Sequence, residues 1–246
     1  MPYLTKSEIE SIAARVFRSY QKLFLHQGGL PSKVEPKILA EKLLGLTVLY
    51  RKLAAPSDVL GLTSPGEVYV AVVGDDGKLS YEHIDGRTII VNASLLDEPS
   101  QIGHLHFTLM HEASHQIYKM LFPKAYACEG TPSVIHYCRR PSRQRQTNWE
   151  EWRTDALAAA ILMPPELIRL HLRQSGLGEK LRMLNRVYAP EEYEQFTKIA
   201  ISLGVSKTAL AIRLRDLCLV ENDYFRNPYD MLDVYPDDDW MKEEAR

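Results

Sequence analysis

The stretch from residue 107 to residue 115 constrains this chain most, and it reads Phe-Thr-Leu-Met-His-Glu-Ala-Ser-His. It contains the pattern His-Glu-x-x-His, at His111, Glu112 and His115. Residues four apart lie on the same side of a helix, so the two imidazoles can bind one metal ion. The apolar residues of this helix fall on another arc, so we expect it to pack on that side and to expose the histidines. Glu112 is then a candidate proton acceptor.

An ordinary amphipathic helix with hydrogen-bonded surface histidines would show the same pattern, and a third ligand distinguishes the two interpretations. Residues 148–163 predict a second helix, on which Glu151 and Asp155 are four residues apart and share a face. This spacing resembles that of thermolysin-like zinc peptidases, and the resemblance implies that Glu151 is the third ligand and that Asp155 holds the other N–H of the first imidazole. Two alternatives stay open: Glu151 forms a capping box with Asn148, or neighbouring Glu150 is the ligand.

The composition bounds the class of protein. The chain has 246 residues, 45% of them apolar, which is enough for one large domain with or without a small appendage. Its formal net charge of −2 gives no overall attraction to nucleic acid or to an anionic membrane. We see no signal-peptide core and no apolar run that would span a bilayer. The 3 cysteines are widely spaced and describe no disulfide framework, so we expect a cytoplasmic protein.

The residues before the His-Glu-x-x-His helix predict two helices and then a small antiparallel sheet. Helical spacing runs through residues 6–25, with Ser7 as the predicted N-cap, and through residues 36–44. A loop that contains Pro56 and Gly61 follows. Three short strands rich in β-forming residues come next, at residues 67–73, 79–84 and 88–91. The exposed edge of such a sheet can pair with an extended peptide.

Residues 122–147 are predicted to be irregular, because prolines and glycine interrupt them. They contain a group of arginines, at Arg139, Arg140, Arg143 and Arg145. We interpret this group as part of a solvated loop rather than as a phosphate-binding or partner-binding patch. Cys128, His136 and Cys138 are three candidate metal ligands with no matching fourth, so a second, structural zinc site is not favoured.

Residues 193–217 predict two helices joined by a turn at Gly204, with Ser206 as the N-cap of the second helix. This arrangement is typical of a helix-turn-helix, and four residues of the second helix are candidates to contact DNA: Lys207, Thr208, Arg213 and Arg215. Residues 221–246 are rich in acidic side chains, which would repel phosphates, so DNA binding is the less favoured interpretation. Aromatic residues within this tail favour docking on the protein or on a partner, and disorder is the alternative.

The chain resembles the ImmA/IrrE-type metallopeptidases at two places. Residues 107–115 resemble their Phe-Thr-Leu-Ala-His-Glu-x-x-His core. Residues 151–164 resemble their second signature, a glutamate followed by Ala-Asn/Asp-x-Phe-Ala-Ala-x-Leu-Leu-Met-Pro. The spacing of Glu151 and Asp155 is also the Glu-x-x-x-Asp arrangement of thermolysin-like zinc peptidases. The resemblance spans roughly residues 35–220.

Three departures from the family pattern are visible. His106 stands where the family usually has arginine, and Ser114 stands where it usually has glycine. The gap between the second histidine and the glutamate is also long, so residues 122–147 resemble an insertion. These changes bear on substrate specificity more than on metal binding.

The resemblance implies an α+β fold, a mainly helical zincin-like metallopeptidase with a small antiparallel sheet before the His-Glu-x-x-His helix. It implies a zinc ion (Zn2+) bound by His111, His115 and Glu151, with Glu112 as the catalytic base. The substrate would be another protein, a helix-turn-helix repressor of a mobile element or a stress regulon. Candidates to stabilise the transition state are His104, His136 and Tyr137, and the sequence does not choose among them.

We expect three parts: a zincin-like peptidase domain at residues 1–190, a helix-turn-helix-like segment packed on it at residues 191–220, and an acidic aromatic tail at residues 221–246. Two other classes of function remain as alternatives. The chain would be a DNA-binding regulator with a vestigial metal site, or a partner-binding antidote protein whose zinc is not catalytic.

Overall fold

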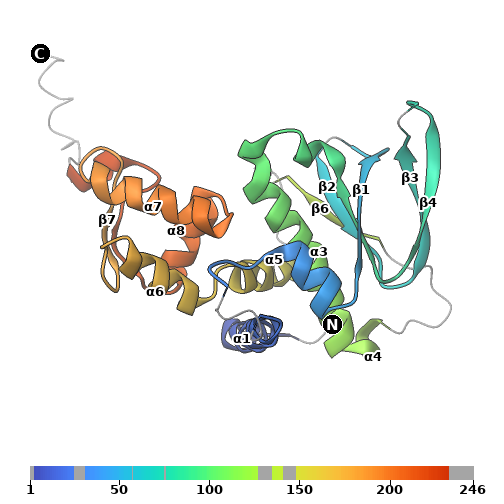
Figure 1. Cartoon of the computed structure of the whole chain (residues 1–246), viewed down its shortest axis with the longest axis horizontal. Coiled ribbons are helices and arrows are strands. Elements are labelled where there is room, and N and C mark those ends of the chain that lie inside the picture. Colours follow the sequence, from blue (N-terminus) through green and yellow to red (C-terminus); the bar gives the residue numbers. More distant parts are fainter. Residues whose placement is uncertain are drawn as a thin grey trace, which may run out of the picture.

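A curled six-stranded sheet and a group of helices lie side by side in the computed structural model of this chain (Figure 1). The structure describes residues 3–24, 31–56, 58–74, 76–126, 135–140 and 148–232. No helix in these ranges is both long enough and apolar enough to cross a membrane. The described chain contains both helices and strands, so its fold is mixed, as the sequence predicts.

The large sheet has the strand order β4-β3-β1-β5-β2-β6. Its strands are β1 (Thr47–Leu53), β2 (Val59–Thr63), β3 (Glu67–Val73), β4 (Leu79–Asp85), β5 (Thr88–Asn92) and β6 (His136–Arg139). Strands β1 and β5 are parallel, whereas the other neighbouring pairs are antiparallel. The predicted small antiparallel sheet is thus wrong in size and type, although its three strands are confirmed as β3, β4 and β5.

Two of the strands that the sequence analysis missed, β2 and β6, escaped it for physical reasons. All 5 residues of β2 are buried, so this strand lacks the alternation of apolar and polar residues that marks a half-exposed strand. Gly61, which was predicted to lie in a loop, is inside it. Strand β6 lies in the segment predicted to be irregular, and it exists because it pairs with β2, a contact between distant parts of the chain.

The longer helices follow the predicted periodicity, whereas a short helix at residues 123–126 lies in the segment predicted to be irregular. The helices are α1 (Lys6–Lys22), α2 (Pro36–Ile38) with its π-helical continuation η2 (Leu39–Leu43), α3 (Ile102–Leu121), α4 (Pro123–Tyr126), α5 (Trp149–Leu162), α6 (Pro165–Gln174), α7 (Pro190–Leu203) and α8 (Lys207–Asp216). Ser7 is not the N-cap of α1. Thr5 is, because its hydroxyl accepts the N–H of Glu8 while the Glu8 carboxylate accepts the N–H of Thr5.

A second, two-stranded sheet joins the helices at the carboxyl end of the described chain. Its parallel strands are β7 (Leu181–Leu184) and β8 (Val220–Asp223). The turn between α7 and α8 has Gly204 in the left-handed region, with φ of 68°, and Ser206 caps α8 through the N–H of Ala209. Both features were predicted. Residues 233–246, which form most of the predicted tail, lie outside the described residues.

Two apolar clusters hold these elements together. The larger cluster runs from α1 through the inner face of the sheet and α3 to α8, so the helix-turn-helix-like segment shares a core with the rest. The smaller cluster lies on the other face of the curled sheet. Strand β5 serves both, because Ile89 and Val91 face the larger cluster while Ile90 faces the smaller one. Helix α3, most of whose residues are buried, lies between the sheet and the helices at the carboxyl end (Figure 1).

Candidate metal centre

Helices α3 and α5 pack together and bring His111, His115 and Glu151 to one point. The Nε2 atoms of the two histidines are 3.2 Å apart. Glu151 Oε2 lies 3.2 Å from Nε2 of His111, and Oε1 lies 3.7 Å from Nε2 of His115. A tetrahedral zinc ion with ligands about 2.0–2.1 Å away holds them about 3.3–3.4 Å from one another. The spacing of these donor atoms therefore fits a single metal ion.

The start of α5 decides between the alternative roles of Glu151. Asn148 is the N-cap, and its side chain accepts the N–H of Glu150 at 3.0 Å. Glu151 is turned toward the histidines, with 15% of its side chain exposed. Glu150 lies 3.7 Å from the guanidinium of Arg153, and it forms a separate group of possible ligands with His115 and His136. The helix is thus capped by Asn148, and the carboxylate of Glu151 is directed to the candidate metal centre.

Asp155 lies where the sequence analysis expected it. Its Oδ1 atom is 2.8 Å from Nδ1 of His111, so the ring presents Nε2 to the other ligands. His115 differs, because its Nδ1 is buried and has no hydrogen-bond partner among the described residues. Its ring instead stacks on that of His136, with 4.2 Å between the centroids. Packing rather than hydrogen bonding therefore orients the second imidazole.

Glu112 is fully buried beside the histidines. The backbone N–H of Cys138, in β6, donates to its Oε1 at 2.9 Å. Its Oε2 is buried and has no hydrogen-bond partner among the described residues. An unpartnered buried carboxylate oxygen is costly, and it signals a missing partner such as a water molecule or an ion. This orphaned oxygen agrees with a metal and its water in the site.

The charges around His111 point the same way. Burial by itself lowers the pKa of His111, but the hydrogen bonds to Asp155 and Glu151 and the nearby Glu112 carboxylate raise this pKa to about 10. Burial also raises the pKa of Glu112 to about 8, against the attraction of His111 and the N–H of Cys138. Glu112, Glu151 and Asp155 thus surround one imidazole in the protein without metal, and the pKa of about 8 keeps Glu112 largely protonated at neutral pH. A bound cation would favour the charged carboxylate of Glu112.

The expected exposure of the histidines is wrong. His111 and His115 are 1% and 2% exposed, and Glu112 is 0% exposed. The side of α3 that was predicted to face solvent is covered by α5 and by strand β6. A helical wheel shows which residues share a side, but it does not show what later segments of the chain pack against that side.

Strand β6 supplies residues that the sequence analysis assigned differently. His136 and Cys138 are two residues apart and share the face of β6 toward α3. On that face His136 lies against His115, whereas Cys138 contacts Thr108. They belong to separate groups of possible ligands in the described chain, and Cys128 lies outside the described residues. The structure thus lends no support to a zinc site shared by these three residues.

Of the candidates to stabilise a transition state, only His136 lies beside the histidine pair. Tyr137 points to the smaller apolar cluster on the other face of the sheet. His104 is exposed and lies about two turns before His111 on α3, at the wall of a cavity. The position of β6, which the sequence did not reveal, separates these three residues.

Gly61 brings β2 close to Glu112, and the sequence analysis missed this role. A Cβ atom at this position would lie 2.6 Å from Cγ2 of Thr108 and 3.4 Å from Cγ of Glu112. Any larger residue would push β2 away from α3. The glycine therefore sets the distance between the sheet and the helix that carries the histidines.

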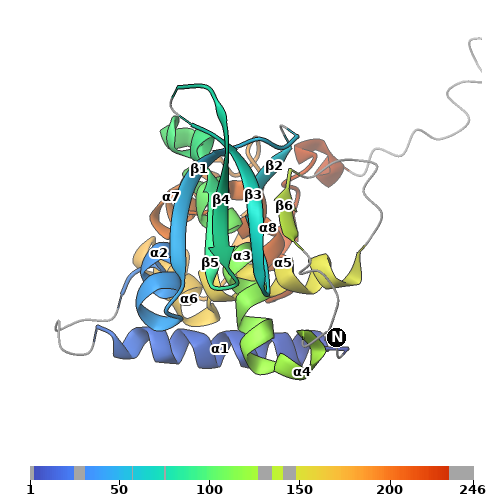
Figure 2. The same ribbon diagram turned by 90° about the vertical axis from the view of Figure 1, so that its right-hand side faces the viewer.

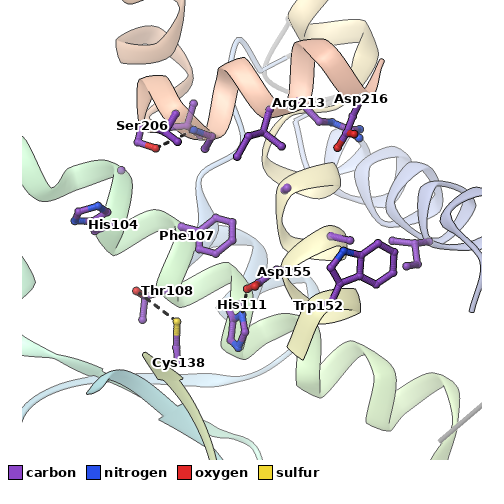
Figure 3. Close-up of a pocket in the computed structure, with 18 of the residues that line it drawn as sticks. His104, Phe107, Thr108, His111, Cys138, Trp152, Asp155, Ser206, Arg213 and Asp216 are labelled. Atoms are coloured by element: carbon purple, nitrogen blue, oxygen red, sulfur yellow. Dashed lines mark hydrogen bonds and ion pairs between the residues drawn. The ribbon is translucent and has the colours of Figure 1, made fainter. Parts of the chain in front are cut away.

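A cavity of about 710 Å³ opens beside the candidate metal centre (Figure 3). His111 and Asp155 lie at one side of it, and Ser206, Arg213 and Asp216 of α8 lie at the opposite side. Phe107 projects into the space between them. The walls come mainly from α3, α5 and α8 and are largely apolar.

The two arginines of α8 that were candidates to contact DNA are held in ion pairs. Arg213 is 3% exposed, donates to the carbonyl of Met163 and pairs with Glu10 of α1. Arg215 pairs with Asp223. The other two candidates are exposed: Lys207 lies over the ring of Tyr193, and Thr208 lines the cavity.

No family model matches the chain, and no curated protein matches it. The resemblance to the ImmA/IrrE-type metallopeptidases therefore rests on the two motifs, at residues 107–115 and 151–164. The geometry of the candidate metal centre is the observation that bears on function.

Proposed function

We propose that this chain is a zinc-dependent endopeptidase with a zincin-like arrangement of its site. The observation that supports this function best is the convergence of His111, His115 and Glu151 at tetrahedral spacing beside the buried, unpartnered oxygen of Glu112. Three protein ligands leave one position of a tetrahedral ion open, which is typical of catalytic zinc and not of structural zinc.

Zinc held by these residues would supply a Lewis acid that polarises a peptide carbonyl and lowers the pKa of water to about 7. Glu112 acts as the base: its Oε2 takes a proton from the water that attacks the peptide carbonyl, and it returns this proton to the amine as the C–N bond breaks. The N–H of Cys138 holds Oε1 and so orients this carboxylate. Asp155 keeps the His111 ring in place, and His136 is the nearest candidate donor to the developing oxyanion.

Strand β6 is at the edge of the sheet (Figure 2), and the N–H of its Cys138 donates to Glu112 beside the candidate metal centre. An extended peptide that adds to this edge would pass close to Glu112. The substrate we propose is a protein, and by resemblance a helix-turn-helix repressor of a mobile element or stress regulon, cleaved in the cytoplasm to relieve repression. The packing of α8 supports this proposal over direct DNA binding by the chain.

Replacing the base and replacing a ligand are expected to have different effects. Glu112→Gln keeps the three ligands and retains zinc, but it loses the proton acceptor, so cleavage falls about 10²–10⁴-fold. Glu151→Gln loses zinc as well as cleavage, because a neutral amide is a poor ligand. Metal content is measured by atomic emission, and cleavage of a co-encoded regulator is followed with and without chelator.

Two outcomes would contradict the proposal. If Glu112→Gln cleaves the regulator as fast as the unchanged protein, Glu112 is not the base. If Glu151→Gln binds zinc as tightly as the unchanged protein, the third ligand is misassigned. Regulation that survives Glu112→Gln and depends on zinc would instead favour a partner-binding protein with a non-catalytic metal.

A further inference from the structure

We propose that the cavity beside the candidate metal centre binds a bulky apolar side chain of the protein substrate, and that α8 forms one wall of this pocket. The inference rests on the proposed function for the nature of its occupant. It assigns the helix-turn-helix-like segment a role in choosing the substrate.

The walls of the cavity offer apolar surface that the fold leaves uncovered. Ile212 of α8 is 47% exposed and Trp152 of α5 is 38% exposed, and both side chains line the cavity. Ala156 and Ala159, which follow Trp152 along α5, leave room with their small side chains. A volume of about 710 Å³ is within the range of ligand pockets, roughly 300–1,000 Å³. This space is larger than packing defects inside a domain.

The charged side chains named below, which line the cavity, are already paired with one another, and this pairing favours an uncharged occupant. Lys6 of α1 contacts Asp216 of α8 at 2.7 Å. Glu10 pairs with Arg213. Asp155 holds His111. The cavity therefore favours an apolar group over an ionic ligand, with Thr108, His104 and hydroxyls of α8 as its polar contacts.

The position of the cavity argues for a peptide side chain as its occupant. His111 and Asp155 line it, and so do Cys138 and Arg139 of the edge strand β6. A peptide paired along β6 with its carbonyl at the metal would pass the opening of the cavity. A side chain next to the cleaved bond would then enter between α3, α5 and α8.

Helix α8 is held firmly enough to act as a wall. A Cβ atom on Gly103 of α3 would lie 2.8 Å from the backbone N of Ser206, so the start of α8 touches α3 directly. His106 lies 3.0 Å from the carbonyl of Gly204 through its Nδ1. The pairs that join α8 to α1 hold its other end. Because this wall is fixed at both ends, the cavity can select substrate side chains by their size.

The test fills the cavity from two walls and compares the choice of peptide. Ala159→Leu on α5 and Ala209→Leu on α8 both narrow the cavity, whereas Ala125→Leu adds the same atoms to an exposed position on α4. Each full-length, zinc-loaded protein is incubated with a synthetic peptide library randomised at every position, and mass spectrometry identifies the cleaved bonds. The retention of uncleaved peptides on immobilised Glu112→Gln protein, with and without each substitution, gives a second readout.

We expect the unchanged protein to favour Leu, Ile, Met or Phe at one position beside the cleaved bond. Ala159→Leu and Ala209→Leu should each reduce this preference about tenfold or more, and Ala125→Leu should not. Circular dichroism identifies a variant that fails to fold, in which case the substitution on the other wall decides. An apolar preference that both folded variants leave unchanged would overturn the pocket, while the peptidase function stands.

The retention readout separates the two proposals if no peptide is cleaved. Retention of apolar peptides that Ala209→Leu abolishes would support the pocket even though the peptidase function had failed. Retention without apolar preference, or no retention at all, would overturn the pocket.

Discussion

His111 is the residue on which the charges of the candidate metal centre converge. Hydrogen bonds to Asp155 and Glu151, together with the Glu112 carboxylate, raise its pKa to about 10 although burial opposes this. An imidazole must be neutral to bind a metal ion. At neutral pH the metal-free protein therefore holds a proton on His111 that the metal has to displace.

Zinc binding at pH 7 is expected to release protons for this reason. Protons compete with zinc for a ligand whose pKa is raised. The apparent affinity for zinc therefore rises with pH and levels off only above the His111 pKa of about 10. Isothermal titration calorimetry in two buffers of different ionisation enthalpy measures the protons released. Asp155→Asn removes a carboxylate that raises this pKa and should release fewer. Zinc binding without proton release would contradict the assignment of His111.

At the scale of elements, local periodicity was sufficient to predict the long helices but not to predict the whole sheet. The apolar spacing of α1, α3, α5 and the α7–α8 pair follows from the turn of the helix itself. Strand β2 has no alternation to detect, because the sheet buries both of its faces. Strand β6 has only 4 residues, and its pairing with β2 is a contact between distant segments.

The contact between β2 and α3 can be tested at Gly61. Gly61→Ala places a methyl group 2.6 Å from Cγ2 of Thr108, so we expect a loss of about 1–3 kcal/mol in the free energy of unfolding. Thr108→Ser removes that methyl group and should restore part of the loss in the double variant. Urea denaturation measures all four proteins. Equal stability of Gly61→Ala and the unchanged protein would show that β2 does not lie this close to α3.

At the scale of the whole molecule, the candidate metal centre joins two helices that are far apart in the sequence. The histidines come from α3 and the glutamate from α5, and both helices are part of the larger apolar cluster. A metal ion bound there cross-links the centre of the fold. Removing the metal should therefore destabilise the whole fold and not only a surface loop.

Chelation is accordingly expected to lower the melting temperature. Free zinc at 100 times its dissociation constant stabilises the folded state by about 2.7 kcal/mol. For a chain of this size each kcal/mol corresponds to roughly 2–4 °C, so the expected loss is about 5–10 °C. Differential scanning calorimetry with and without chelator measures it. Glu151→Gln is the control, whose melting temperature should not respond to zinc, and an unresponsive unchanged protein would argue against the site.

The sequence by itself determined the pairs whose geometry is local: His111 with His115 on one helix, and Glu151 with Asp155 on another. Residues four apart share a helical face whatever the rest of the chain does. Only the tertiary structure decided that these pairs meet, that β6 covers Glu112, and that α8 closes a cavity beside them. Those arrangements depend on packing between distant segments, which no local period encodes.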